Sequence, residues 1–414
     1  MNVSLPSALE QIQEWAETGQ WDQKISSVMD MLDTRLDPEQ VAEARAVQMN
    51  TLVEKKFGTP TLRKSVPAGS KIFRHKWVDE LRRGDYRSRY TCADLKVRYS
   101  KEELAAETNI ASPTPYEESW ELLDIKALKR NYNQRSGDVR CAFLVGKDSG
   151  DANGAPVYMY TCAEYETHYW AWLAGQSREV QQRFAGADYR KDVVIRLEGD
   201  LCGRRPAGAT FRDEFEAVMT VELKEHGYHF ERGKLDPCVY SCKVSDVTVV
   251  HHVDDTGATG PDADLDYLHE KTGLGAYLDM KIGKSEGPGT VVHRLGRKKL
   301  RTHDSIITVP NEKHQAKIIA LLELENGKPS KVAGRRIELT AENTQLVDAA
   351  RAAIFPKAVG SAIYLSVDRR DIKFEVKELA RHMSAERCRE CDWENLIILG
   401  RYLLFKPNVA RITV

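Results

Sequence analysis

The residues best suited to chemistry are His252, Val253, Asp254 and Asp255, which follow a β-branched run at residues 247–250. Such a run predicts a strand, and the two acids with the glycine that follows indicate that it ends in a tight turn. Adjacent carboxylates repel one another unless a divalent cation or a basic partner neutralises them, and oxygen ligands of this kind suit Mg²⁺. The alternative is a solvated turn that carries two acids, since aspartate is common in turns.

A third acid, Asp138, precedes an apolar run, and we expect a strand over Asp138–Val145 with Asp138 at its head. A carboxylate at that position lies at the edge of a sheet, where a cation could join it to Asp254. Two-metal phosphoryl transfer needs such convergence of acids from separate strands, with the two cations about 4 Å apart. We therefore predict that Asp138 and Asp254 form one metal site. The alternative for Asp138 is a solvent-facing residue at the start of a strand.

Two other groups of residues could hold a metal. His251 and His252 with Asp254 and Asp255 could form the site of an unrelated metal-dependent hydrolase, but neighbouring residues of a strand point to opposite faces. Cys388-Arg-Glu-Cys391 has a ligand-like spacing, yet a zinc site would need a second pair, and only His382 lies nearby in the sequence. The alternative for this pair is two cysteines near the start of a helix.

Length and composition set broad limits on the protein. A chain of 414 residues is too long for one compact core and predicts two to four subdomains. A hydrophobic content of 42%, a charged content of 30% and a formal net charge of −1 are ordinary for a globular protein, so a polyanion would need local basic patches. The chain has no long apolar run and no secretory start, which predicts an intracellular protein, cytoplasmic or nuclear, without membrane contact and with reduced cysteines.

Hydrophobic periodicity and turn residues predict alternating helices and strands. Helices are expected over 1–56 with a break near Asp37-Pro38, and over 117–133, 162–185, 311–324, 341–354 and much of Val359–Leu404, and one is expected to follow Gly208. Strands are expected over Lys71–Val78, Tyr86–Val97 and Asp138–Val145, with a hairpin of Cys238–Val244 and Val247–Val253. A polar stretch is expected after Gly260.

The region between Arg63 and Lys101 is strongly basic, with twelve lysines and arginines against four acids. Charge runs of this kind are usually solvated faces. This one is interleaved with Phe73, Trp77 and tyrosines, a pattern that also fits a surface that contacts phosphates and stacks on bases.

Eleven segments of the chain resemble, in order, the reverse transcriptase region of copia-type LTR retrotransposons. They are Lys76–Val78, Tyr86–Arg89, Ser112–Pro113, Asp138–Leu144, Val157–Met159, Leu201–Arg205, Asp236–Tyr240, His252–Asp255, Val359–Leu365, Arg370–Ile372 and Gly400–Leu403. The resemblance covers roughly residues 70–404. Each motif alone is weak, whereas eleven motifs in the family's order form a specific pattern.

The resemblance implies an α+β right-hand polymerase of fingers, palm and thumb, with an antiparallel palm sheet backed by helices. It implies an RNA-directed DNA polymerase that uses two Mg²⁺ ions, a dNTP and an RNA or DNA template with its primer. The expected domains are a helical N-terminal extension at 1–56, fingers and palm at 57–260, and a thumb or connection-like region at 261–414 that ends before a ribonuclease H domain.

The resemblance also implies roles for single residues. Asp138 and Asp254 would bind both metals with support from Asp255, and Phe143 would crowd a ribose 2′-hydroxyl. Arg87 and Arg89 would bind the incoming triphosphate, where a guanidinium can pair with two oxygens at once.

The resemblance implies that Gly203 and Arg205 lie near the templating base. The alternative for Gly203 is a plain turn glycine.

The chain departs from the family at several positions. His252 replaces the usual tyrosine, and Pro206–Phe211 and Arg369–Ile372 differ from the family's pattern. These departures keep a second hypothesis open, a catalytically silent descendant that binds nucleic acid or only folds.

Overall fold

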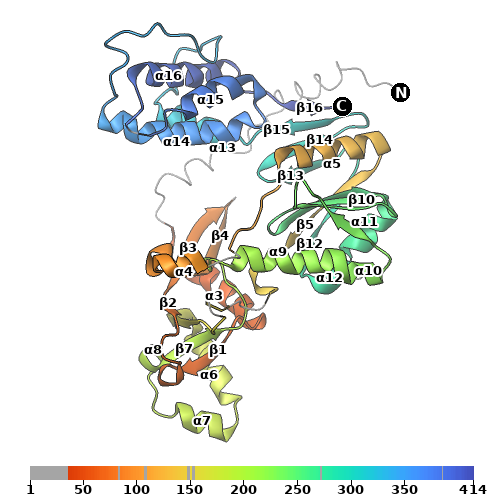
Figure 1. The fold of residues 1–414 in the computed structure, drawn as a ribbon, viewed down its shortest axis with the longest axis vertical. Helices are drawn as coiled ribbons and strands as arrows, with labels where there is room; N and C mark the ends of the chain where they lie inside the picture. The colour runs from red at the N-terminus through yellow and green to blue at the C-terminus, as the bar shows by residue number, and fades with distance from the viewer. Residues whose placement is uncertain are drawn as a thin grey trace. The chain divides into compact units, whose positions relative to one another are not determined.

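The computed structural model describes residues 36–414, except for 83, 107–109, 147–149, 152–153, 271–272 and 385. The described residues form two compact units (Figure 1). The N-terminal unit comprises residues 36–116 and 135–284, and the C-terminal unit comprises 117–134 and 285–414. The expected domains at 1–56, 57–260 and 261–414 remain a prediction, because compact units do not assign the roles of fingers, palm and thumb. No described helix is long and apolar enough to cross a membrane.

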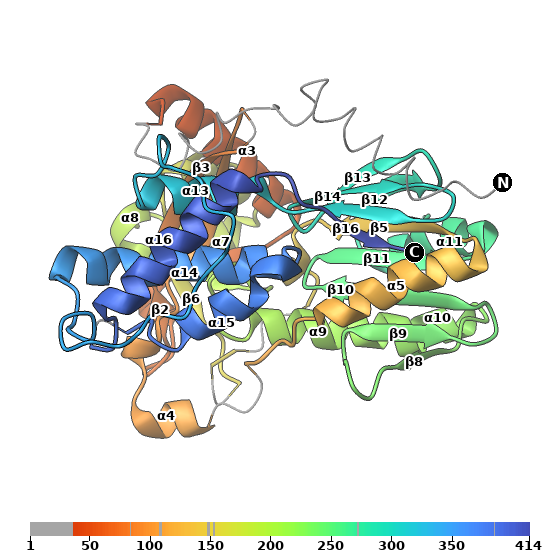
Figure 2. The same ribbon diagram turned by 90° about the horizontal axis from the view of Figure 1, so that it is seen from above.

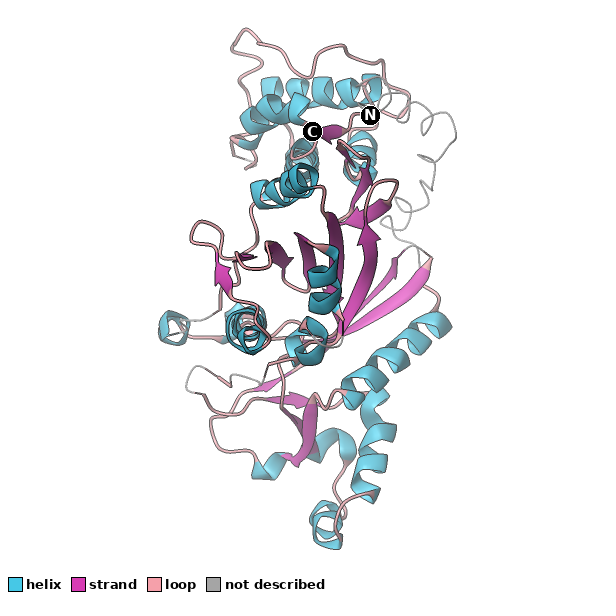
Figure 3. Cartoon of the chain, turned by 90° about the vertical axis from the view of Figure 1, so that its right-hand side faces the viewer, coloured by secondary structure: helices cyan, strands magenta, loops and turns pink. Residues whose placement is uncertain are grey.

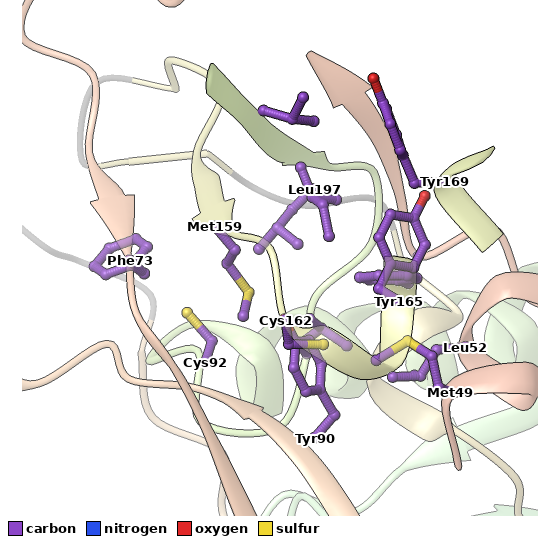
Figure 4. Packing of buried hydrophobic residues seen from close by; sticks show 14 of the residues in the cluster. Met49, Leu52, Phe73, Tyr90, Cys92, Met159, Cys162, Tyr165, Tyr169 and Leu197 are labelled. Atoms are coloured by element: carbon purple, nitrogen blue, oxygen red, sulfur yellow. The ribbon is translucent and has the colours of Figure 1, made fainter. Parts of the chain in front are cut away.

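The first core of the N-terminal unit lies around a four-stranded sheet of order β1-β7-β6-β2. Its strands are β1 Gly58–Leu62, β7 Val193–Leu197, β6 Tyr158–Tyr160 and β2 Ile72–Phe73, and the helices beside it are α3 Pro38–Glu54, α6 Glu166–Ala174, α7 Arg178–Phe184 and α8 Tyr189–Asp192. Met49 and Leu52 of α3 pack with Tyr90, Met159 and Leu197 in this core (Figure 4). The apolar face of α3 therefore holds this helix against the sheet.

The predicted break near Asp37-Pro38 is the start of α3. The Asp37 carboxylate accepts hydrogen bonds from the backbone N–H groups of Glu39 and Gln40, and Pro38 occupies the first turn. Both features are typical of a helix N-terminus. The expected helices before residue 36 lie outside the described residues.

A separate antiparallel pair follows, formed by β3 His75–Arg82 and β4 Asp85–Cys92. The strand expected over Lys71–Val78 is divided between β2 and β3, which belong to different sheets. The strand expected over Tyr86–Val97 is confirmed as far as Cys92, and Lys96–Arg98 form a turn of 3₁₀ helix. A short helix, α4 Lys101–Ala106, comes next. The pair β3–β4 forms a sheet of its own with only two strands.

The second sheet of the N-terminal unit has six strands in the order β12-β5-β11-β10-β9-β8. Figure 3 distinguishes the strands of the molecule from its helices by colour. They are β12 Met280–Glu286, β5 Asn133–Val139, β11 Asp255–Gly260, β10 Val247–His252, β9 Val239–Cys242 and β8 Phe230–Arg232. The helices are α9 Ala207–Ala217, α10 Leu223–Glu225, α11 Asp262–His269 and α12 Leu274–Tyr277, with a π-helical turn at Val218–Glu222. Apolar residues of these helices pack with Tyr240, Val249 and Ala258 of the strands. The described residues therefore form a mixed fold of helices and sheets.

The expected strand Asp138–Val145 is wrong in its position. The strand β5 ends at Val139, so Asp138 lies at its end and not at its head. Cys141 then adopts a left-handed conformation with φ of 50°, and Ala142–Leu144 form a 3₁₀ turn. A non-glycine residue in this region breaks a strand, so the apolar residues after Asp138 form a turn that packs on the core.

The C-terminal unit contains a sheet of order β13-β14-β15-β16 and a group of helices (Figure 2). The strands are β13 Val291–Arg294, β14 Arg297–Arg301, β15 Ile306–Val309 and β16 Arg411–Thr413. The helices are α5 Glu117–Arg130, α13 Glu312–Leu321, α14 Ala349–Ser366, α15 Lys373–Ala380 and α16 Glu390–Phe405. Apolar residues of α13–α16 share one core.

Two expectations for the C-terminal part of the chain are wrong. The helix expected over 341–354 begins at Ala349, where the Asp348 carboxylate accepts a hydrogen bond from the Arg351 backbone N–H. The single long helix expected over Val359–Leu404 is three helices, α14, α15 and α16. The expected helices at 117–133 and 311–324 are confirmed as α5 and α13.

Candidate functional site

The hairpin of β10 and β11 presents Asp254 at its tip. His252 pairs with Asp255, so Val253 and Asp254 form the loop between the strands. Val253 has a φ of 56°, which is a costly conformation for a β-branched residue. Its side chain packs against the core of the six-stranded sheet, and this contact holds the strained turn in place. Asp254 is exposed as a result, while His252 and Asp255 are half-buried.

The neighbouring strand β5 brings Asp138 to this tip. The backbone N–H of Val139 donates to the carbonyl oxygen of Asp254 at 2.9 Å. Partial burial of Asp138 raises the pKa of its carboxyl group, and the negative charge of Asp254 raises it further. Arg87, Lys281 and Arg140 oppose this shift without cancelling it. The two carboxylates are therefore close enough to repel, as a shared cation site requires.

The tip brings together two carboxylates, those of Asp138 and Asp254. No group of three or more His, Cys, Asp or Glu side chains in the described ranges has a geometry that could hold a metal. Asp255 is thus not assembled with Asp138 and Asp254 into a three-acid site. Two carboxylates nevertheless suit Mg²⁺, which commonly binds through one or two carboxylates, waters and substrate phosphates.

Arg87 and Arg89 extend from the outer face of β4. Arg87 is exposed, and its charge lowers the pKa of Asp138, so it lies within electrostatic range of the acids. The Nη1 atom of Arg89 lies 3.1 Å from Oε1 of Glu80 on β3. The charge of Arg89 acts on the Cys202 thiol, and so does that of Asp254. Arg87 and Arg89 of β4 therefore lie in the same region of the N-terminal unit as Asp138 and Asp254.

Phe143 lies in the 3₁₀ turn that follows β5 and packs, half-buried, against the core of the six-stranded sheet. The turn begins four residues after Asp138, so Phe143 is held near the acids by a packed element. Its expected contact with a sugar remains a prediction.

The fold itself requires a glycine at position 203. Its φ is 88°, and a Cβ at this position would collide with the carbonyl oxygen of Cys92. The backbone N–H of Cys92 also donates to the carbonyl of Cys202 at 2.8 Å. A turn that only glycine can make therefore explains Gly203 without a substrate.

Arg205 and its neighbour Arg204 belong to a polar cluster beside that turn. The Arg205 guanidinium lies over the Tyr99 ring at 4.8 Å, and its backbone N–H donates to Asp94 at 3.2 Å. Arg204, which the sequence did not single out, is fully buried and donates from Nη1 to Asp94 Oδ2 at 2.6 Å. Arg204 is a buried structural group, and no sequence pattern distinguishes it from its half-buried neighbour Arg205.

No protein-family model and no curated protein sequence matches the chain. Three solved structures of telomerase are similar to it. The apo telomerase from Candida tropicalis has 8% identity and a TM-score of 0.40 over 87% of this chain and 66% of that protein. Its form truncated from the C-terminal domain has 10% identity and a TM-score of 0.33 over 64% and 59%. The telomerase from Candida albicans in complex with a fragment of telomeric RNA has 9% identity and a TM-score of 0.33 over 89% and 65%.

The chain therefore spans 59%, 65% and 66% of the lengths of these three telomerases. At TM-scores this low the neighbours assign neither a family nor an activity to this chain.

The two histidines of the hairpin lie on different faces, as strand alternation predicts. His251 is 1% exposed and stacks on Phe215 with ring centroids 4.5 Å apart. Burial lowers the pKa of His251 to about 4, which makes it a neutral core residue. His252 lies on the other, half-buried side. The metal-dependent hydrolase site of His251, His252, Asp254 and Asp255 is therefore not assembled among the described residues.

The cysteine pair near the C-terminus also belongs to a core. Cys388 and Cys391 are buried free thiols at the start of α16. Burial raises the pKa of Cys388 to about 12, which disfavours the thiolate that binds metals.

Proposed function

We propose that this chain is an RNA-directed DNA polymerase of the copia type. The single observation that carries the proposal is the approach of Asp138, near the end of β5, to Asp254 in the adjacent hairpin turn, with Arg87 within electrostatic range of Asp138. A cation relieves the repulsion between the two acids, and Mg²⁺ at such a site also binds the phosphates of a substrate. Arginines nearby can form hydrogen bonds to the same phosphates. In this proposal the strands β3 and β4 belong to the fingers, the six-stranded sheet is the palm, and α13–α16 belong to the thumb.

The residues of the chain divide the work by chemistry. Asp138 and Asp254 would hold two Mg²⁺ ions, with Asp255 in a supporting position at the start of β11. When bound, the metal lowers the pKa of the attacking hydroxyl and neutralises the leaving pyrophosphate. Arg87 and Arg89 bind the triphosphate oxygens of the dNTP, and Phe143 crowds the ribose 2′-hydroxyl. Arg205 lies near the templating base, while Gly203 provides the turn that positions it.

The second candidate function is a catalytically silent descendant that binds nucleic acid. It is favoured by the absence of a three-acid metal group in the described part of the chain and by the altered segment Pro206–Phe211. His252 in place of tyrosine is compatible with either function.

Primer extension by the purified protein tests the proposal. The substrates are an RNA or DNA template with an annealed primer, dNTPs and Mg²⁺. Extension that is lost in Asp254→Asn supports the polymerase. Binding of the primed template without extension supports the silent descendant. Hydrolysis of the substrate without extension would overturn both.

A further inference from the structure

The strand β4 carries two faces with different environments. Arg87 and Arg89 point to the outer face, whereas Ser88, which lies between them in the sequence, is 3% exposed. Strand alternation explains this difference, because successive side chains point to opposite faces. Whatever holds Ser88 therefore also sets the backbone from which both arginines project.

Ser88 is held by Asp79, its partner in the register of β3 and β4. The Ser88 hydroxyl donates to Asp79 Oδ1 at 2.7 Å. Asp79 in turn accepts two hydrogen bonds from the Arg45 guanidinium, from Nε at 3.1 Å and from Nη2 at 2.8 Å. A bidentate pair of this kind fixes orientation as well as distance.

Arg45 extends from α3 and makes further contacts. Its Nη1 lies 3.1 Å from Glu164 Oε1, and its guanidinium lies 5.2 Å from the centre of the Trp77 ring. The paired guanidinium lowers the pKa of Asp79, so the carboxylate stays charged. Arg45 thereby connects the strand pair to α3 and to the 3₁₀ turn Ala163–Tyr165.

The strand pair needs such an anchor. A sheet of two strands alone is marginally stable in water, and β3 and β4 form one. The core side chain of Tyr90 anchors one part of β4, and the Asp37 backbone N–H donates to the Tyr86 hydroxyl at 3.1 Å at another. The hydrogen bonds to Asp79 lie between these two points, directly behind the arginines.

We propose that Arg45, Asp79 and Ser88 form a positioning network that aims Arg87 and Arg89 at the triphosphate of the incoming nucleotide. This inference rests on the proposed function. The three residues do not touch the substrate; they act through the backbone of β4, which carries the arginines. The network thus connects α3, outside the motifs of the family resemblance, to nucleotide binding.

Ser88→Ala tests the network, and Thr91→Ala is its matched control. The Thr91 hydroxyl also makes a hydrogen bond on β4, donating to the Lys76 carbonyl at 2.7 Å, but on the outer face. We expect Ser88→Ala to raise the KM for dNTP about two- to tenfold, the range for one lost hydrogen bond, with kcat nearly unchanged. Thr91→Ala should leave both constants near those of the parent, and Ser88→Thr should restore the KM.

A triple substitution separates positioning from general stability. If Ser88 acts through the arginines, Ser88→Ala should add no further increase in KM to a variant that already carries Arg89→Ala and Arg87→Ala. Independent, multiplying effects would overturn the inference. So would an unchanged KM in Ser88→Ala when the parent extends primers, and the proposed function would then stand. A parent that extends no primer would overturn the proposed function and this inference together.

Discussion

The two units of the chain use carboxylates in opposite ways. In the C-terminal unit, Glu117, Glu121 and Asp124 lie on one face of α5, and each has a basic partner on the sheet. The pairs are Glu117 with Arg297 at 3.1 Å, Glu121 with Arg411 at 2.5 Å and Asp124 with Lys299 at 2.7 Å. In the N-terminal unit, neither Asp138 nor Asp254 forms an ion pair with a residue of the described ranges. Acids of the first kind stabilise a fold, whereas acids of the second kind are the ones that bind a cation in the proposed function.

Electrostatics separates the two kinds of acid. Burial of Asp124 opposes its charge, but Lys299 and Arg294 outweigh that effect and lower the pKa of its carboxyl group. Burial of Asp138 and the charge of Asp254 raise the pKa of Asp138 instead. A raised pKa means that the folded protein disfavours the ionised form, which is a cost that a functional site can retain.

Asp138→Asn should give the largest effect, because it should lower activity and raise stability. We expect primer extension to fall about a thousandfold, since a bound cation contributes several kcal/mol to catalysis. The melting temperature at pH 7 should rise. The raised pKa makes ionised Asp138 destabilising above that pKa, and the gain should vanish in acid, below the ordinary aspartate pKa of about 4. Thermal melts across pH, beside extension rates, measure both. A lower melting temperature at pH 7 would assign Asp138 to the structural acids.

Lys299→Met should have the opposite character, a loss of stability without a direct role in chemistry. It leaves Asp124 fully buried without its cation, which typically costs about 3–5 kcal/mol of unfolding free energy. The double variant Lys299→Met with Asp124→Leu should recover most of that loss. Arg370→Gln is the control, because Arg370 pairs with Glu121 at the surface and should cost less than about 1 kcal/mol. Urea unfolding measures all three, and equal losses would remove the distinction between buried and exposed pairs.

Local sequence patterns predict the hairpin of β9 and β10 well, because β-branched runs and turn residues act over short distances. The same patterns fail for β14, whose Arg297, Lys298, Lys299 and Arg301 suggest a solvated segment. The acids that neutralise several of these cations come from α5, far away in the sequence. Burial that depends on distant partners cannot be seen in a local pattern.

Prediction of the site was limited in a similar way. The shared metal site of Asp138 and Asp254 stays a prediction, and the end of β5 at Val139 depends on the left-handed Cys141, which no local signal announces. Gly203 was expected near a templating base, whereas its φ and the Cys92 carbonyl require glycine in any case. The roles of Arg87, Arg89, Phe143, Arg205 and His252 stay predictions.

The hairpin that carries Asp254 should lose stability in acid through its buried face. The pKa of His251 is about 4 in the folded protein and about 6.5 when unfolded. Stability is therefore complete above pH 6.5 and falls as the pH decreases towards 4, by up to about 3 kcal/mol, because only the unfolded chain takes the proton. His251→Phe should flatten this dependence, while His303→Gln, at an exposed position, should not. Chemical unfolding at pH 7 and pH 5 measures the free energy of unfolding of each form. An equal loss between the two pH values in the parent and both variants would exclude His251 as the cause.

The arginines of β4 give the smallest effects and extend the comparison to surface charge. Arg89→Ala should weaken nucleotide binding by about 1.5–3 kcal/mol, the range for hydrogen bonds to charged groups. Its partner Glu80 is about as exposed as Arg89 itself, with side-chain exposures of 36% and 35%, and such pairs contribute at most about 1 kcal/mol. Glu80→Gln should therefore leave stability unchanged and lower the KM for dNTP slightly, because the triphosphate no longer competes with Glu80 for the guanidinium. Steady-state kinetics at low and high salt measure both variants. A KM that rises in Glu80→Gln would show that Glu80 holds Arg89 in place for the substrate, and the surface pair would then resemble the paired acids of the C-terminal unit.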